Sequence, residues 1–439
     1  MAKHQKNLER KNLWFRKKLV QKIGDFQIGD SVIPDLPKFN TKSKSQLKDG
    51  NNVQYLESIE RDHPLFFQKE FDFDIVDPTA HILDDEYSIA SKSSLDGFIR
   101  LTCDGVATWI NPDLKKNGVF LGDLYSLYKK FPDQISEFIN RKQYFRDSSI
   151  TAFLHAVTGN AVVVYVPDHI KSDGLIKVEV HTPTDKNVIV PVHVLVIIGK
   201  FTRTNLSLEI RSLMENNRSV ILLNQNDFIL QESAELAVFR HQKTNGNTLN
   251  LVDDVIYQKR YSHNQFLTLD FGGKGVSSKT SIDLDGEGAE SNVTGIYRPS
   301  QGSKFYYDTK QLHGASHTVS DLLYKGVLGK NAYSSWKGNI VVQKGTEGTN
   351  GYQANNNLII HESAKVESLP GLEIITDDVK CSHGVTIGNI DKNHMFYLQS
   401  RGINIKDAES LIIEGFLLSS LNRLKTRVFD EQISLITNN

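Results

Sequence analysis

From residue 162 to residue 388 the chain is a long series of short apolar runs without a helical period. Each run has roughly four to seven residues rich in Val, Ile, Leu and Phe, and Gly, Asn, Asp or Ser separate one run from the next. Runs of this composition between turn residues are typical of strands. The sequence therefore predicts a mainly β protein whose centre contains hardly a helix. Examples are residues 161–166, 192–198, 206–210, 266–271 and 372–375.

Several of these runs alternate apolar and polar residues, as residues 205–210 and 280–285 do. Alternation places one side of a strand against a core and the other side in water. The runs recur at irregular spacings of roughly 11 to 18 residues, which suits a sandwich, a barrel or the stacked turns of a β-solenoid. On the residues alone these architectures stay equally supported.

The composition changes on both sides of this series, which predicts three units. Residues 1–157 form a helix-rich N-terminal domain, residues 158–388 form the β core, and residues 389–439 form a C-terminal helical domain. The first unit begins with a Lys-rich segment ending at Lys22, which predicts a solvated amphipathic helix rather than a secretory or transit signal. Within residues 1–157 the expected strands are 98–101 and 106–110, and the expected helices are 8–23, 121–131, 135–139 and 150–157.

The C-terminal unit contains two predicted helices. Asp391 can cap the first helix and Gly402 can end it. Asn404 can start the second, with Asp407 three residues on in an approximate capping-box relation. Residues 411–421 are apolar in nearly every direction around this second helix, so it needs two neighbours. One neighbour is the rest of the chain, and the other is either a helix of its own bundle or a partner subunit.

Charge and cysteine usage exclude several classes of protein. The 439 residues include 51 Lys or Arg and 52 Asp or Glu, so the net charge of -1 indicates neither nucleic acid nor a membrane as a partner. The two cysteines, Cys103 and Cys381, are too few for a disulfide framework or a four-thiolate metal site. No apolar run approaches the roughly 20 residues that cross a bilayer. These features predict a soluble protein of the reducing cytoplasm.

Cys381 and His383 form the most suggestive pair for chemistry. If the strand that begins near residue 372 continues through them, they point to the same face and can reach one metal. A thiolate beside an imidazole favours zinc, copper or an iron–sulfur species. Two ligands leave such a site incomplete, so the others come from another chain, from a small thiol, or from Cys103 if the fold brings it close. The plainer alternative is a half-buried cysteine beside a surface histidine.

A second kind of site rests on carboxylates. Asp283, Asp285 and Glu287 alternate along one face, as the acid and base of a polysaccharide lyase or hydrolase would. A solvated acidic face at a turn is the simpler interpretation. His313 and His317, four residues apart, could hold a metal on a helix, but Gly314 favours a loop and a structural role for both.

Glycine-rich turns do not add a nucleotide site. Residues 272–275 and 285–288 contain the glycines of a phosphate-binding loop without its G-x-x-x-x-G-K-[ST] pattern. Neither stretch lies between a strand and a plausible helix. We therefore interpret both as ordinary turns.

The C-terminal third resembles the SufB/SufD family of iron–sulfur cluster assembly. The Lys-Cys-Ser-His-Gly stretch at 380–384 is the form typical of the SufD branch of that family, whereas the SufB branch reads more like Glu-His-Glu-Ala-Thr at this point. The resemblance is specific between residues 335 and 417, looser through the middle of the chain and only general before residue 118. The matching stretches are residues 338–342, 353–358, 372–374, 377–384, 395–403 and 408–416.

The resemblance implies a right-handed parallel β-helix flanked by N-terminal and C-terminal helical domains. It implies a SufB-like paralogue bound through the β-helix, and a homodimer is possible when the chain is alone. Cys381 and His383 would then lie at the interface of the two chains, where an iron–sulfur cluster is held transiently and shared with the partner. The remaining ligands that this pair lacks would come from that partner.

The resemblance also implies a SufC-like ATPase held by the C-terminal helices. Since this chain has no nucleotide-binding motif of its own, the resemblance implies a scaffold subunit that is not an enzyme and binds no nucleotide. ATP hydrolysis would belong to the partner and would act on the shared interface through the docked helices. The residues that match the docking segment are Phe396, Arg401, Leu411, Ile412, Gly415, Phe416 and Leu417.

Overall fold

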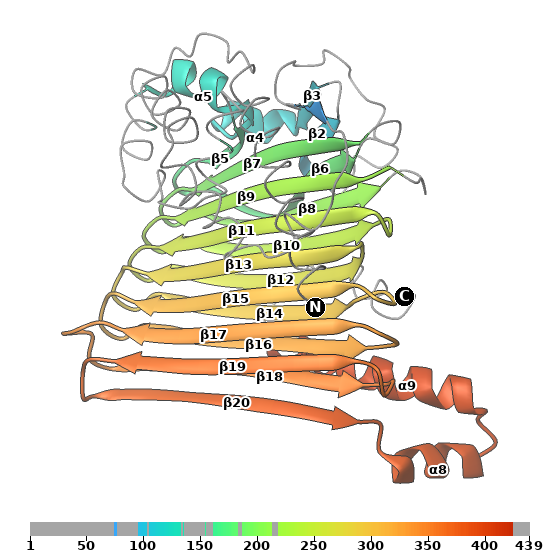
Figure 1. Ribbon diagram of the computed structural model, residues 1–439. Coiled ribbons are helices and arrows are strands. Elements are labelled where there is room, and N and C mark those ends of the chain that lie inside the picture. The colour runs from blue at the N-terminus through green and yellow to red at the C-terminus, as the bar shows by residue number, and fades with distance from the viewer. Residues whose placement is uncertain are drawn as a thin grey trace, which may run out of the picture.

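The computed structural model describes residues 74–76, 95–102, 105–132, 135, 154, 161–182, 187–212 and 218–424. Their strands form two ten-stranded sheets that lie face to face, and successive strands alternate between the sheets (Figure 1). From β5 to β20 every neighbouring pair within a sheet is parallel. Neighbours are alternate strands of the chain, which excludes a sandwich of hairpins or an up-and-down barrel. The predicted mainly β fold is confirmed, and it is a parallel β-solenoid.

Each turn of the solenoid contributes one strand to each sheet. The first sheet contains β5 (Val162–Val166), β7 (Val188–Ile198), β9 (Val220–Leu230), β11 (Thr248–Gln258), β13 (Gly275–Leu284), β15 (Lys304–His313), β17 (Tyr333–Val342) and β19 (Lys365–Ile374). The second contains β6 (Lys171–Thr182), β8 (Arg203–Ser212), β10 (Glu235–Thr244), β12 (His263–Gly272), β14 (Glu290–Arg298), β16 (Val319–Leu328), β18 (Thr349–Ile359) and β20 (Val379–Asn389).

The core lies between the two sheets. Alternate residues of each strand point inward, as Val220, Leu222 and Phe228 of β9 do. Parallel pairing in register places each inward residue on an inward residue of the next turn, so Phe228 is followed by Ile256 and then by Ile282. This stacking explains why short alternating runs suffice here, since every run buries its apolar side against two neighbours.

Several corners between the sheets turn at residues with a left-handed backbone that are not glycine. The φ angle is 64° at His169, 55° at Phe201 and 53° at Tyr261. The rings of His169 and Phe201, on successive corners, stack with centroids 5.4 Å apart and an interplanar angle of 7°. The stacked side chains help to offset the cost of that backbone conformation, which glycine alone adopts freely.

The interior also contains buried charges. The guanidinium of Arg240 on β10 lies 3.5 Å from a carboxylate oxygen of Asp254 and 3.5 Å from one of Asp270, and all three residues are buried. Asn226 donates a 2.7 Å hydrogen bond to Asp254. A charged group in the core is tolerated only when it is paired in this way.

At the N-terminal end short elements extend the sheets and then turn back on them. β2 (Leu95–Thr102) pairs in parallel with β6 and antiparallel with β3 (Gly105–Ile110), and β4 (Phe120–Asp123) pairs antiparallel with β5. β1 (Asp74–Ile75) joins β7. Each sheet therefore ends in an antiparallel pair, whereas its interior pairs are parallel. Two short helices accompany these strands, α4 (Pro112–Lys116) and α5 (Leu124–Lys130).

These elements agree with the expected strands and shift one expected helix. The strands predicted at 98–101 and 106–110 are β2 and β3. The helix predicted at 121–131 begins at Leu124, because residues 120–123 form β4 and the side chain of Asp123 caps the helix by accepting from the Ser126 amide. The Lys-rich segment up to Lys22 and Cys103 lie outside the described residues, as do the helices expected at 135–139 and 150–157 except for the buried Ile135 and Leu154.

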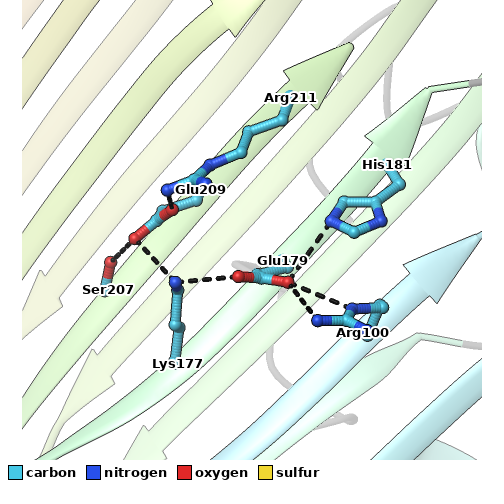
Figure 2. A network of polar contacts seen from close by, with 7 residues as sticks. All are labelled: Arg100, Lys177, Glu179, His181, Ser207, Glu209 and Arg211. Atoms are coloured by element: carbon cyan, nitrogen blue, oxygen red, sulfur yellow. Dashed lines mark hydrogen bonds and ion pairs between the residues drawn. The ribbon is translucent and has the colours of Figure 1, made fainter. Parts of the chain in front are cut away.

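A network of charges on the outer face ties β2 to the solenoid (Figure 2). Glu179 of β6 bonds to Arg100 of β2 at 3.0 Å and to His181 at 3.3 Å. Lys177 bridges Glu179 at 2.8 Å and Glu209 of β8 at 3.2 Å. Burial alone would raise the pKa of Glu179, but its hydrogen bonds to His181 and Lys177 and the positive charges around it outweigh burial and hold that pKa well below its usual range. The network therefore stabilises the charged form of Glu179.

At the other end two helices follow β20, α8 (Lys392–Ser400) and α9 (Ile405–Leu418), before the short turn η2 (Leu421–Arg423). The predicted caps are confirmed: Asp391 accepts from the Asn393 amide, and Asn404 accepts from the Asp407 amide at 2.9 Å. Gly402 ends the first helix with φ of 86°. α9 packs on the outer face of the second sheet (Figure 1). None of the helices that the structure describes is long and apolar enough to span a membrane.

Candidate functional site

The Lys-Cys-Ser-His-Gly motif lies on β20, the last strand of the second sheet. β20 pairs with β18 in register, so Cys381 follows Gly351 and His383 follows Gln353. Gly351 and Gln353 are buried and face the interior, in line with Ser320 and Leu322 of β16. Cys381 and His383 therefore share the inward face at the C-terminal end of the solenoid, as their spacing predicts.

The thiol of Cys381 is free and half-buried. A Cβ atom placed on Gly351 would lie 3.3 Å from the Cys381 sulfur and 3.3 Å from Nε2 of His313. The absence of a side chain at residue 351 thus lets the thiol face His313 of β15 across the interior. Burial raises the pKa of the Cys381 thiol, and the nearby Gly351 amide opposes that rise only in part.

His313 has a structural role in this arrangement. Its Nδ1 lies 2.7 Å from the hydroxyl of Thr318, and its Nε2 lies 2.8 Å from the hydroxyl of Ser320. Burial lowers the pKa of His313 to about 4, so the ring is neutral near pH 7. With both nitrogens hydrogen-bonded, His313 is a neighbour of the thiol rather than a free ligand. Sequence reasoning assigned a structural role to His313 but did not place it beside Cys381.

His383 is exposed, unlike the cysteine two residues before it. The described residues contain no group of three or more His, Cys, Asp or Glu side chains arranged to hold a metal ion. A tetrahedral metal or an iron–sulfur cluster takes four ligands, so Cys381 and His383 could supply only part of such a set. Cys103 lies outside the described residues.

The end of the solenoid around this pair is open. β19 and β20 are the outermost strands of their sheets, and each has a strand neighbour on one side among the residues that the structure describes. Apolar side chains are exposed on and beside them, whereas most apolar side chains of earlier turns are buried. An exposed strand edge beside apolar side chains is suited to pairing with another chain. The exposed apolar residues are Leu369, Leu372, Ile374, Ile375, Val385 and Ile387.

A second apolar surface lies on the C-terminal helices. Phe396 is 74% exposed and Leu411 is 48% exposed, and Ile405 and Tyr397 are exposed as well. The guanidinium of Arg401 lies 4.9 Å from the ring centroid of Tyr397. Large side chains held in water on adjacent helices are typical of an interaction surface.

The other face of α9 is turned toward the solenoid. Leu417 is 1% exposed and packs with Ile413 against the outer face of the second sheet. Lys325 of β16 donates a 2.8 Å hydrogen bond to the Phe416 carbonyl and lies 4.7 Å from the Phe416 ring centroid. Of the expected docking residues, Phe396, Arg401, Leu411 and Gly415 are exposed, Ile412 and Phe416 are half-buried, and Leu417 is buried.

The three carboxylates of the alternative site bond to separate partners. Asp283 accepts a 2.6 Å hydrogen bond from Ser281. Asp285 pairs with Lys259 at 2.9 Å, and Glu287 pairs with Arg260 at 3.5 Å. Each of the three carboxylates thus has a hydrogen-bond or ion-pair partner of its own, as in the solvated acidic turn that the sequence favours.

Comparison with known proteins gives a consistent picture. The family model described as SUF system FeS cluster assembly, SufBD core domain, matches residues 181–416. The iron–sulfur cluster assembly protein SufD of Escherichia coli strain K12 is 33% identical over 187 residues, which is 43% of this chain and 43% of that protein. A SufBD family protein of Synechocystis is 26% identical over 201 residues, which is 45% of this chain and 44% of that protein.

These matches to curated relatives span less than half the length of each relative. The family model covers more, from the end of β6 into α9, and it includes the motif strand β20. Since that span exceeds half of the chain, the protein belongs to the SufBD family of the SUF system.

Proposed function

We propose that this chain is a SufD-type scaffold subunit in the assembly of iron–sulfur clusters and is not itself an enzyme. The observation on which this rests is the placement of Cys381 and His383 on the inward face of β20, at the open end of the solenoid, in a member of the SufBD family. A soft thiolate and an imidazole suit iron–sulfur chemistry. The cluster is cargo that the chain helps to build and then releases.

The coordination chemistry supports a site shared between two chains. Two ligands from this chain leave room for ligands from a partner, and the exposed His383 lies where a partner can approach. The raised pKa of Cys381 keeps the thiol protonated near pH 7 until iron displaces the proton. Cluster binding is therefore coupled to release of a proton from Cys381.

The partner that we propose for the open end is a SufB-like paralogue. A parallel strand of a second β-helix can pair with β19 or β20 and cover apolar side chains such as Val385 and Ile387. When that partner is absent, a second copy of this chain can use the same surface. The same proposal places the protein in the cytoplasm, where free thiols stay reduced.

The partner that we propose for the C-terminal helices is a SufC-like ATPase, which would bind and hydrolyse the nucleotide in place of this chain. Phe396, Arg401, Leu411, Ile412 and Gly415 form the accessible part of the docking surface. Phe416 and Leu417 support that surface from behind, since they hold α9 on the solenoid.

The test of the shared site is purification of the tagged chain from its own host without oxygen, with measurement of native mass, iron and sulfide. We expect a heteromeric complex that contains iron and sulfide. Cys381→Ser or His383→Ala should remove iron and sulfide and leave the partners in place. Thr386→Ala, on the outward face of the same strand, is the matched control and should retain both. A metal-free chain recovered alone would contradict the proposal.

The docking surface is tested with exposed residues, because a charge at the buried Leu417 would disturb folding instead. Phe396→Asp and Leu411→Asp should each abolish capture of the ATPase and leave the unfolding midpoint of the chain unchanged. Lys406→Ala, an exposed polar position on α9, should bind the ATPase as the parent does. Unchanged capture by both Asp variants would assign the ATPase to another surface.

A further inference from the structure

A ladder of outward-facing residues crosses the second sheet and ends inside the Cys-Ser-His motif. Asn292 of β14, Asp321 of β16 and Tyr352 of β18 are register partners, and the next residue in line is Ser382 of β20. Ser382 lies between Cys381 and His383 in the chain. Ser382, the outward-facing residue of the motif, is therefore the fourth residue of this ladder, counted from Asn292 on β14.

Arg423 contacts each of the first three rungs. Asn292 donates a 3.4 Å hydrogen bond to the Arg423 carbonyl, and the Arg423 guanidinium lies 2.9 Å from a carboxylate oxygen of Asp321. The contact with Asp321 is an ion pair rather than a well-aligned hydrogen bond. The same guanidinium lies 5.2 Å from the ring centroid of Tyr352, within the range of a cation–π contact.

Tyr352 extends this contact to the motif strand. Its hydroxyl oxygen would lie 3.3 Å from a Cβ atom on Gly384, which is closer than an ordinary van der Waals contact. Gly384 follows His383 directly, and the chain neighbours of Tyr352 are the register partners of Cys381 and His383. A displacement of Tyr352 therefore acts on the motif from two directions, along the strand pairing and through Gly384.

At the other end of this path, Arg423 belongs to the C-terminal helical segment. It closes η2, which follows α9 after Ser419 and Ser420. The exposed apolar residues of α8 and α9 lie on the same segment. Arg423 thus connects the helical segment to three strands of the sheet, to β14 through its backbone carbonyl and to β16 and β18 through its side chain.

We propose that Arg423 and Tyr352 are positioning residues that hold the Cys381–His383 strand and tie it to the C-terminal helices. The inference rests on the proposed function for the meaning of the site, and it adds the route by which a partner held on α8 and α9 affects that site. The physical reason is that β20 pairs with a single described strand, so its place depends more on such contacts than that of an interior strand does.

The test is the rate at which iodoacetamide labels Cys381 in the purified full chain, followed by peptide mass so that Cys103 is counted separately. We expect Arg423→Gln and Tyr352→Leu each to raise the labelling rate about threefold to tenfold, the range set by loss of a cation–π contact. Arg423→Lys keeps the positive charge and should restore most of the parent rate. This measurement needs neither cluster nor partner, so its failure is distinct from failure of the proposed function.

The matched control is Arg260→Gln. Arg260 also combines a cation–π contact, 4.6 Å from the Tyr261 centroid, with an ion pair to Glu287, but it lies on a distant corner. It should leave the labelling rate of Cys381 unchanged. An equal rise with Arg260→Gln would reduce the effect to general loosening and overturn the proposal.

The double variant decides whether the two residues act on one path. If they do, Arg423→Gln in the Tyr352→Leu background adds little to the labelling rate, because the contact is already lost. The proposal would be overturned if the two substitutions multiplied each other's effect on the labelling rate, or if each single variant labelled at the rate of the parent. Should Tyr352→Leu fail to fold, Tyr352→Phe keeps the ring under Arg423 and removes only the hydroxyl beside Gly384, and it should show the rise that is due to Gly384 alone.

Discussion

The two ends of the solenoid differ in how they are closed. At the N-terminal end β2 is covered by the antiparallel β3 and tied down by the charged network around Glu179 (Figure 2). At the C-terminal end β19 and β20 have described strand neighbours on one side only. Every residue of β11, in the middle, is buried, whereas no residue of β20 is.

This contrast does not come from the composition of the strands. β20 contains inward apolar residues such as Val385 and Ile387, in register with Asn355 and Asn357 of β18. In an interior turn those side chains would be covered by the next turn, and here nothing described covers them. The last turn thus has the inward apolar residues of an interior turn although it lies at an end of the solenoid. This supports the proposal that a second chain continues the stack.

The largest difference should appear when the same side chain is truncated in both places. Ile256 on β11 is fully buried, and Ile387 on β20 is 46% exposed. Ile256→Ala should lower the free energy of unfolding by about 2–5 kcal/mol, because it removes core contacts and leaves a cavity. Ile387→Ala should lower it by less than about 1 kcal/mol, because the Ile387 side chain buries little apolar area in the isolated chain.

The comparison of Ile256→Ala with Ile387→Ala is made by urea denaturation at low protein concentration, where a dimer dissociates. An equal loss for the two variants would mean that the last turn is covered in solution. A loss for Ile387→Ala that grows with protein concentration would identify the cover as a second copy of this chain.

The closed end depends on its charges. Glu179→Gln removes the negative charge that Arg100, Lys177 and His181 contact, and it should lower the free energy of unfolding at pH 7 by about 2 kcal/mol. Because the pKa of Glu179 is held below its usual value, its contribution is present above the unfolded-state value near 4.5 and is lost as the pH falls further. Parent and variant should therefore converge in acid.

A suitable control for Glu179→Gln is Asp173→Asn, which breaks the exposed ion pair of Asp173 with Arg203 at 2.8 Å. Surface pairs contribute little, so this variant should change stability by less than about 0.5 kcal/mol. If the two variants were equally mild, the network would not hold β2 in place.

Much of this contrast could be anticipated from the sequence, but only locally. Asp391 and Gly402 determine where α8 begins and ends, and Asn404 determines where α9 begins, because capping depends on neighbouring residues alone. Alternation of apolar residues shows that a strand buries one face without showing what covers it. The alternation therefore supports a solenoid and a sandwich equally, and the family resemblance indicates the solenoid that the structure has.

The contacts around the site depend on register between turns, which no local pattern encodes. The register between turns places His313 of β15 opposite Cys381. The glycine at residue 351 leaves the space between the two side chains open. The apolar residues of α9 likewise predict two neighbours without showing that Leu417 faces the sheet and Leu411 faces water. The corners at His169 and Phe201 have left-handed backbones without glycine, so turn composition does not reveal them.

The interior charges should give a pH dependence opposite to that of the closed end. Burial raises the pKa of Asp254 to about 6, although Arg240 and Asn226 oppose the rise. The stability that follows from its protonation is complete below the unfolded-state value near 3.8 and is lost as the pH rises through about 6. Asp254→Asn removes this loss, so its stability relative to the parent should improve between pH 4 and pH 7. Relative stability that falls over that range would show that the folded protein lowers the pKa of Asp254 instead of raising it.

The smallest expected effect concerns the thiol of the open end. Because burial raises the pKa of Cys381, its labelling by iodoacetamide should reach half of the maximal rate above pH 9, and in urea it should do so at a lower pH. Following the peptide that contains Cys381 by mass gives both profiles, and the unfolded chain serves as its own control. A folded-state midpoint below that of the unfolded chain would mean that a positive charge near the thiol already stabilises the thiolate. In that case a larger fraction of Cys381 would be thiolate before iron arrives, and fewer protons would be released on binding.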